Sequence, residues 1–321
     1  MAVKETRIQA AGASSPAGGL ALPDRTTLIA FALMVLFAGA AAVAVRITFN
    51  ELPPFWSGGA RFGAAALIFW ALMLIRKVPL PRGRALAGAA LFGFLGVGAA
   101  FIFSMWGLVE TPAGLFTVIG ALVPLLTIIF AFLHKLEKLR WQALTGALLA
   151  VAGIGFAVNG YRGSAVSLPH IIAILVGTAC MAESAVIAKL TPRSHPVATN
   201  AVGMTVGAAM LLGASLIAGE QWVLPSQPAT WAAYLYLVVF VSVGVFMLYL
   251  WVLGRWTASG TSFAFVLMPL VTISLASIIS NEPITLSLVA GAALVIAGVL
   301  FGAIVKPKER ETEDSFECRP C

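Results

Sequence analysis

Ten apolar segments follow one another along the chain, and each is long enough to cross a membrane as a helix. A helix needs about 20 residues to span roughly 30 Å of hydrocarbon, and it satisfies its own backbone hydrogen bonds without water. Charged residues make up only 10% of the chain and hydrophobic residues 60%, whereas soluble domains carry about 25% charged residues. We therefore predict an all-α integral membrane protein with ten transmembrane helices, at 27–48, 54–75, 85–107, 111–133, 140–160, 169–190, 197–218, 229–253, 259–280 and 285–305.

Lysine and arginine are distributed unevenly among the segments that connect these spans. Alternate segments hold basic clusters such as Arg76-Lys77 and Arg82, whereas Arg162 is the basic residue clearly placed in the remaining loops. Because positive residues accumulate on the cytoplasmic side, we expect a multi-pass protein of the inner (plasma) membrane with both termini in the cytoplasm. Orientation signals also account for the net charge of +7, so no nucleic-acid partner is expected.

The chain resembles itself at a constant offset of 145 residues. Each copy contains five spans, and because five is odd the second copy enters the membrane from the opposite side. Such inverted repeats are common in secondary transporters, whose substrate site lies between the halves. The first span then has a counterpart in the sixth, which argues against its removal as a signal peptide. The most distinctive matched pairs are Pro124 with Pro269, Glu137 with Glu282, and Trp106 with Trp251.

Cys318 and Cys321, near the C-terminus, form a single C-x-x-C. Because a zinc site needs four ligands, we expect no metal there.

The internal repeat divides the chain into five parts. The predicted parts are a cytoplasmic tail at 1–26, a first five-helix repeat at 27–160, a linker at 161–168, a second five-helix repeat at 169–305 and a cytoplasmic tail at 306–321.

Short motifs in both halves resemble the drug/metabolite transporter superfamily, EamA family. They are A-L-V-P-L-L at 121–126 with L-E-K-L at 136–139, V-L-M-P-L-V at 266–271 with N-E-P-I at 281–284, and A-R-F-G-A-A-A at 60–66. The resemblance covers about 27–305. It implies a transporter of small metabolites that works by alternating access, with a central cavity lined mainly by spans 1, 3, 4, 6, 8 and 9. Within this family, the sequence is similar to exporters of amino acids, including aromatic ones.

Glu183 is the one acidic residue well inside a predicted span. A carboxylate is costly in lipid, so it should face a cavity or a cation, or be protonated. We interpret it as a site for a substrate ammonium group or for a proton coupled to transport. The alternative is a structural ion pair with Arg61 or Lys189. Arg61 itself could meet a substrate carboxylate, but a structural role is favoured because the second span is not a main cavity wall in the resembled family.

Two paired positions have expected structural consequences. Pro124 and Pro269 lie inside spans four and nine, where proline removes a backbone hydrogen bond and kinks a helix, and we predict that they act in gating. Glu137 and Glu282 precede spans five and ten. We expect these carboxylates to cap those helices, since negative charge is favourable at a helix N-terminus.

The proposed cargo is an amino acid with an apolar or aromatic side chain. Phe101 and Phe246 would line its pocket, and Thr117, Ser242 and Tyr249 would supply hydrogen bonds. Drugs, organic cations or other metabolites remain alternative cargoes. A membrane-embedded enzyme is the alternative from another class, but it needs grouped acids, bases or metal ligands. The three histidines lie at loops or span ends, so we predict a transporter without enzymatic activity and without a cofactor.

Overall fold

The computed structural model describes residues 24–136, 141–159, 167–192, 194–255 and 258–304. Within these ranges the secondary structure is helical, with no strand. The helices are α1 (Arg25–Thr48), α2 (Pro54–Ile75), α3 (Arg84–Phe92), α4 (Ala100–Glu110), α5 (Ala113–Gly120), α6 (Val123–Leu133), α7 (Trp141–Asn159), α8 (Leu168–Leu190), α9 (Pro196–Ile217), α10 (Pro228–Tyr236), α11 (Phe246–Arg255), α12 (Ala258–Ser280) and α13 (Leu286–Ile304).

Two π-helical segments join neighbouring α-helices into long continuous units. η1 (Gly93–Ala99) lies between α3 and α4, and η2 (Leu237–Val245) lies between α10 and α11. They begin 144 residues apart, at Gly93 and Leu237. π-Helical turns are rare, and those that occur are often found at functional sites. Two of them at matching places in the two halves are therefore not expected by chance.

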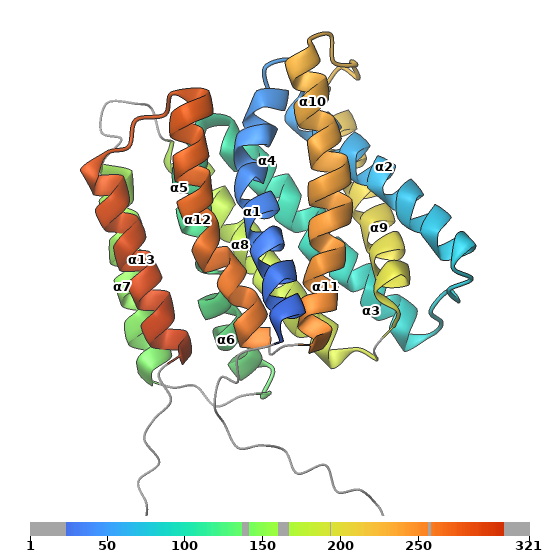
Figure 1. Cartoon of the computed structure of the whole chain (residues 1–321), viewed down its shortest axis with the longest axis horizontal. Coiled ribbons are helices and arrows are strands. Elements are labelled where there is room, and N and C mark those ends of the chain that lie inside the picture. The colour runs from blue at the N-terminus through green and yellow to red at the C-terminus, as the bar shows by residue number, and fades with distance from the viewer. Residues whose placement is uncertain (1–23, 137–140, 160–166, 193, 256–257, 305–321) are drawn as a thin grey trace, which may run out of the picture.

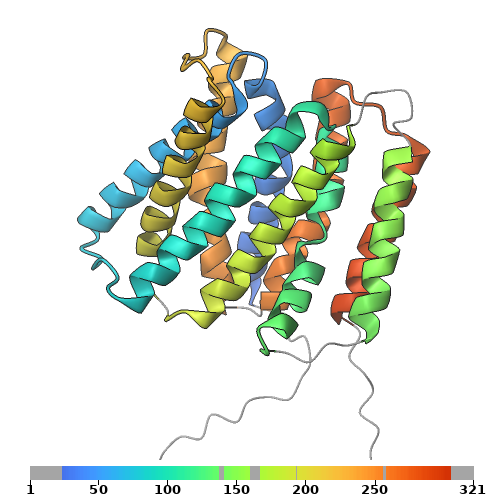
Figure 2. The same ribbon diagram turned by 180° about the vertical axis from the view of Figure 1, so that it is seen from behind.

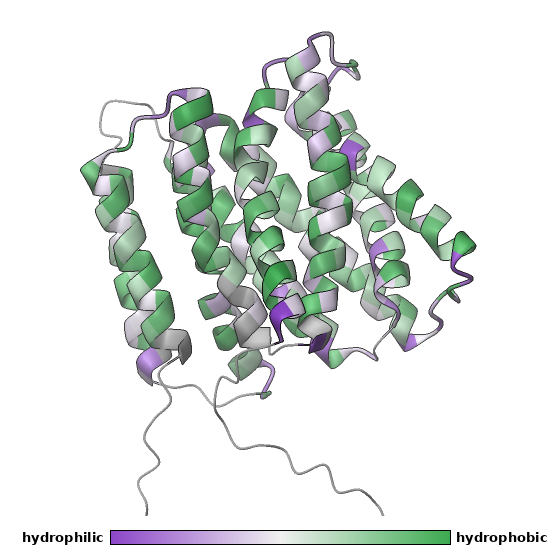
Figure 3. Cartoon of the chain, viewed as in Figure 1, coloured by the Kyte–Doolittle hydropathy of each residue, from purple (hydrophilic) through white to green (hydrophobic). Residues whose placement is uncertain are grey.

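Among the described residues, seven helical units are long and apolar enough to cross a membrane, and three further helices contain shorter apolar stretches. The shorter ones are Leu144–Val158, Ala264–Ser280 and Leu286–Phe301, which lie in α7, α12 and α13. Figure 3 shows hydrophobic residues along the helices and hydrophilic residues gathered near their ends. The protein is therefore a multi-pass membrane protein.

Two helix pairs form opposite edges of the bundle. α7 packs along α13 at one edge, and α2 packs along α9 at the other (Figures 1 and 2). The first pair approaches closely, since a Cβ atom added to Gly291 would lie 2.5 Å from the carbonyl oxygen of Gly153. Small residues permit such contact between membrane helices.

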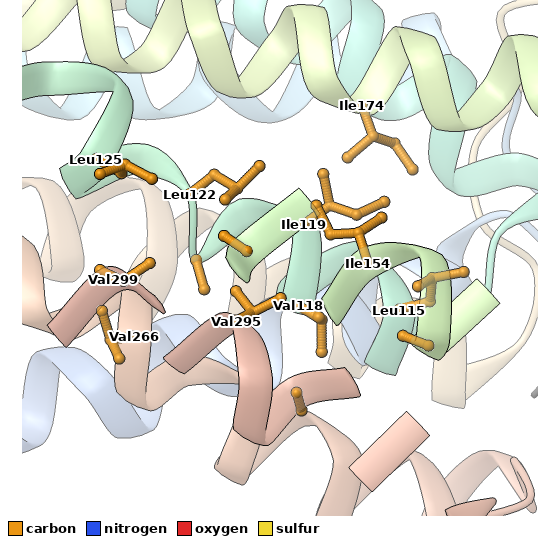
Figure 4. Packing of buried hydrophobic residues seen from close by; sticks show 14 of the residues in the cluster. Leu115, Val118, Ile119, Leu122, Leu125, Ile154, Ile174, Val266, Val295 and Val299 are labelled. Atoms are coloured by element: carbon orange, nitrogen blue, oxygen red, sulfur yellow. The ribbon is translucent and has the colours of Figure 1, made fainter. Parts of the chain in front are cut away.

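The largest buried cluster joins the α7–α13 pair to the centre of the bundle (Figure 4). Ile154 comes from α7 and Val295 from α13, and they lie among Leu115 and Ile119 of α5 and Ile174 of α8. Next to this cluster, α8 also packs along α4, and both views show the two side by side. Packing therefore places α5 and α8 between the edge pair and the interior.

The two ends of the bundle differ in what they hold. We call the end with Arg25 of α1 and Ile304 of α13 the tail end, and the opposite end the far end (Figure 1). At the far end, three glutamates accept hydrogen bonds from backbone N–H groups in the first turn of a helix or just before it. Such N–H groups have no partner within their own helix, and a carboxylate also opposes the positive end of the helix dipole.

Each of these glutamates caps a helix distant from it in the sequence. Glu51 accepts from the backbone N–H of Gln227 at 3.2 Å, before α10. Glu220 accepts from the N–H of Trp56 at 2.7 Å, in α2. Glu282 accepts from the N–H of Ala113 at 3.1 Å, in α5.

The prediction that Glu282 caps α13 was therefore wrong. At α13 the Thr285 hydroxyl accepts from the Leu288 N–H at 3.1 Å instead. The physical reason is that the segment before α13 lies against the start of α5, whose N–H groups need acceptors as well. Glu137, predicted to cap the fifth span, lies outside the described residues.

Candidate functional site

A cavity of about 210 Å³ lies at the centre of the bundle. Its walls come from α1, from the α3–η1–α4 and η2–α11 units, from α5, α6, α8 and α12, and from one residue of α2. Apart from that residue, these are the helices that the family resemblance implied as cavity walls. The α7–α13 pair contributes no lining residue among the described residues.

The wall of the cavity is mostly apolar and rich in polarisable groups. Methionine side chains from four helices contribute thioethers, and six aromatic residues contribute rings. The polar side chains among the described lining residues carry hydroxyls, such as those of Ser104 and Thr178, and one guanidinium. The methionines are Met34, Met105, Met181 and Met268, and the aromatic residues are Phe92, Phe101, Phe116, Phe246, Tyr249 and Phe265.

Four of the six predicted substrate residues line this cavity, namely Thr117, Phe101, Phe246 and Tyr249. The Thr117 hydroxyl donates to backbone carbonyl oxygens one turn earlier, Gly114 at 3.0 Å and Ala113 at 3.2 Å. Its oxygen lone pairs therefore stay available as acceptors. The other two predicted residues, Ser242 and Glu183, are not among the lining residues.

Ser242 contacts Arg61, which lines the cavity. The Ser242 hydroxyl accepts a hydrogen bond from Nε of Arg61 at 2.9 Å. Arg61 is 1% exposed, and its guanidinium carbon lies 4.4 Å from the ring centre of Phe62 and 5.4 Å from that of Phe101. It is the only charged side chain that lines the cavity among the described residues.

Part of the Arg61 guanidinium has no partner. Its Nη2 is buried without a hydrogen bond, and no carboxylate pairs with it in the described part of the chain. An arginine has five N–H donors and no acceptor. The sequence interpretation favoured a structural role for Arg61, but the structure places it against the cavity.

Glu183 points to a different neighbour from those considered in the sequence. Its carboxylate lies 2.6 Å from Nε2 of His134, at the end of α6. The two side chains are 22% and 38% exposed, and neither residue lines the cavity. Neither Arg61 nor Lys189 pairs with Glu183.

The two prolines occupy unequal helical settings. Pro124 lies in the first turn of α6, after α5 has ended at Gly120, whereas Pro269 lies inside the continuous helix α12. In a regular helix each N–H donates to the carbonyl four residues earlier, and proline has no N–H. Inside α12 the carbonyl that loses this donor belongs to Phe265, whereas Gly120 is the last residue of α5, and both residues line the cavity.

No group of three or more His, Cys, Asp or Glu side chains gathers in the described residues as a metal site would require. Cys318 and Cys321 lie outside those residues. The described wall of the cavity offers a ligand apolar surface, hydroxyl groups and one cation.

Comparison with known proteins assigns the chain to a family. The EamA-like transporter family matches it twice, over residues 25–159 and 168–303. The chain belongs to the EamA-like transporter family. The inner membrane transporter YedA of Escherichia coli (strain K12) is 31% identical over 280 residues, covering 86% of this chain and 88% of YedA. We therefore identify the protein as a membrane transporter.

Other relatives of this EamA-like transporter are more distant. The transporter YvbV of Bacillus subtilis (strain 168) is 26% identical, covering 87% of this chain and 92% of its own. A probable terminal-alkyne amino-acid exporter of Streptantibioticus cattleyicolor is 28% identical over 68% of this chain and 74% of its own. One crystal structure shares the fold, with a TM-score of 0.64 and 19% identity over 86% of this chain and 96% of the other.

In this EamA-like transporter, the sequence carried one signal for Arg61 that the prediction gave too little weight. Arg61 interrupts an apolar span within the A-R-F-G-A-A-A motif, and an intramembrane charge is a candidate functional residue by default. The lining methionines gave no comparable signal, because Met is equally suited to filling ordinary core space.

Proposed function

We propose that this EamA-like transporter exports amino acids with apolar or aromatic side chains by alternating access. The observation that carries the proposal is the chemistry of the cavity, where rings and thioethers surround a few hydroxyls and one guanidinium. Apolar walls with a few placed polar groups are typical of small-molecule sites. The relative from Streptantibioticus cattleyicolor, a probable amino-acid exporter, supports the same class of cargo.

The size and charge of the cavity separate this cargo from its alternatives. Its volume of about 210 Å³ is below the roughly 300–1,000 Å³ typical of sites for drug-sized ligands. Organic cations would meet the Arg61 charge without a carboxylate in the described wall to offset it. A zwitterion suits the wall better, since the carbonyls of Gly120 and Phe265 can accept from an ammonium group.

The architecture proposed for this mechanism is ten transmembrane helices in a 5+5 inverted repeat. The two family matches, the corresponding positions of η1 and η2, and the equivalent packing of α1 on α12 and of α8 on α6 support it. Both termini would be cytoplasmic, so the tail end faces the cytoplasm and the far end faces outward. The repeats would exchange conformations, with Pro124 and Pro269 as bending points.

We assign the conformation of the transporter from the contacts at the far end. At this end Nε of Arg46, in the first proposed half, lies 3.6 Å from the Glu282 carboxylate, in the second. Together with the glutamate caps between the halves, this contact joins the two proposed halves at the far end. We propose that this is the conformation closed to the outside.

Transport by purified protein in liposomes tests the proposal. L-Phenylalanine and L-leucine should move across the membrane, whereas tetraethylammonium should not, because the cavity is lined by a cation. A liposome without protein is the blank. Transport of sugars, nucleotides or organic cations without amino-acid transport would overturn the cargo and leave the family assignment intact.

A further inference from the structure

The Arg61 guanidinium lies buried in the wall of the cavity with part of its hydrogen-bonding capacity unused. It is 1% exposed, its Nη2 has no hydrogen bond, and no carboxylate pairs with it in the described chain. A buried charge is unfavourable unless it is paired and hydrogen-bonded. Neighbouring rings offset part of this cost, but they leave the donors of Nη2 unused.

The geometry points to Arg61 as the docking point for the carboxylate of the transported molecule. The cargo class would then be small carboxylates with an apolar or aromatic side chain. This inference specifies the cargo class of the proposed function, and it rests on that function only for the transport step. The carboxylate is recognised by the guanidinium whether or not the molecule also carries an ammonium group, so the two ideas can fail separately.

The contacts of Arg61 hold the guanidinium in one orientation. Nε donates to the Ser242 hydroxyl at 2.9 Å, while the rings of Phe62 and Phe101 lie 4.4 and 5.4 Å from the guanidinium carbon. With Nε engaged, Nη2 is the nitrogen whose donors have no partner in the described chain. A carboxylate can accept two parallel hydrogen bonds from one edge of a guanidinium.

The surroundings select what accompanies the carboxylate. Phe101 contacts the Phe62 ring edge-on at a centroid distance of 4.7 Å, and Phe246 does so at 6.3 Å. Both Phe101 and Phe246 line the cavity. A carboxylate on Arg61 therefore places the rest of the molecule beside these rings, where an apolar or aromatic group buries its surface. A neutral molecule would leave the charge unpaired, and a cation would be repelled.

Three probes that share a phenyl group separate the charges of the ligand. 3-Phenylpropionate carries the carboxylate alone, 2-phenylethylamine carries the ammonium alone, and L-phenylalanine carries both. Binding to the full-length purified protein is measured by calorimetry and by the ligand-induced rise in Tm. The test variant is Arg61→Met, which keeps length and removes charge. The matched control is Arg76→Gln, at the exposed end of the same helix.

We expect Arg61→Met to weaken 3-phenylpropionate binding about 10- to 150-fold, the range for losing a hydrogen bond to a charged group. Arg76→Gln should bind like the wild type. 2-Phenylethylamine should bind Arg61→Met at least as well as the wild type, because a repulsive charge is gone. Tm without ligand should be unchanged or raised in Arg61→Met, since an unpaired buried charge is replaced by an apolar side chain.

Two results would overturn the assignment. One is equal weakening of all three probes together with a lowered Tm, which is the signature of a residue that only supports the fold. The other is undiminished binding of 3-phenylpropionate to Arg61→Met. If 3-phenylpropionate binding depends on Arg61 while L-phenylalanine is not transported, the carboxylate site stands and the proposed amino-acid cargo fails.

Discussion

Removing Glu282 should open the far end of the cavity to the outside. This carboxylate accepts from the Ala113 N–H at 3.1 Å and from the Gly114 N–H at 3.5 Å, and it lies 3.6 Å from Nε of Arg46. It thereby connects the segment before α13 to α5 and α1. The Glu282→Ala variant loses every one of these contacts, whereas Glu282→Gln keeps an acceptor without the charge.

The size of the effect follows from which contact dominates. The Arg46 and Glu282 side chains are 33% and 15% exposed, and an ion pair that water still reaches contributes only about 0.2–1 kcal/mol. A hydrogen bond to a charged group contributes about 1.5–3 kcal/mol, so the bond from Ala113 is the main term. If it exists only in the closed conformation, its loss shifts the equilibrium toward the outward-open state by roughly 10- to 150-fold.

Cysteine labelling measures this shift. Ala41 lines the cavity from α1, and Ala41→Cys would be made in a chain whose own three cysteines are replaced by serine. An impermeant maleimide applied to intact cells should label this position faster in Glu282→Ala than in the parent, with Glu282→Gln between them. Equal labelling rates in all three would refute the gating role of the Glu282 contacts.

A control at the same end distinguishes gating from a general loss of surface charge. Glu110 lies 3.2 Å from His170, and its side chain is 49% exposed. Glu110→Gln should leave the labelling rate unchanged, because this pair does not connect the α12–α13 segment to α5. Faster labelling in Glu110→Gln would show that any lost acid loosens the far end.

Three further outcomes are expected. Replacing Pro124 and Pro269 together with Ala should leave the folded protein intact by size-exclusion chromatography but slow liposome transport, and an unchanged rate would exclude proline from gating. Glu183→Gln should abolish accumulation driven by a pH gradient while retaining substrate exchange if Glu183 carries a coupled proton; loss of neither activity would leave a structural pair with His134. Hydrogen bonds to the Glu51 carboxylate, the most important of them from the Ser226 hydroxyl, lower the pKa of Glu51 below 4.5. The contribution of this carboxylate to stability is therefore present above pH 4.5 and is lost as the pH falls through the lowered pKa. The acid-induced fall in Tm should therefore be smaller in Glu51→Gln, and an unchanged pH profile would contradict this cap.

Sequence patterns predicted where the described helices lie, and seven helical units in the described residues are long and apolar enough to cross a membrane. The reason is that the bilayer imposes the length and composition of such helices. The same patterns did not predict rotation about a helix axis. Glu183 and Arg61 both interrupt apolar spans, yet only Arg61 lines the cavity. Depth in the membrane can be counted from a span end, but the facing of a side chain depends on how neighbouring helices pack.

A local sequence pattern could not predict the hydrogen-bond partners of the loop glutamates either. A carboxylate just before a helix normally suggests a cap for that helix, and this reasoning misassigned Glu282. Its actual partner, Ala113, is 169 residues away in the chain. The break between Gly120 and Val123 was likewise missed as a helix end, although Pro124 marked its position.

During synthesis, the start of α2 leaves the ribosome long before the residue that caps it. Trp56 and Glu220 are 164 residues apart, which at about 5–20 residues per second corresponds to roughly 10–30 s of translation. For that interval the first turn of α2 must rely on water or lipid headgroups for its free N–H groups. Trp222, which stacks on Trp56 at 4.7 Å, arrives with Glu220. A nascent chain halted before this loop would therefore expose an unfinished helix end to quality-control proteases of the membrane.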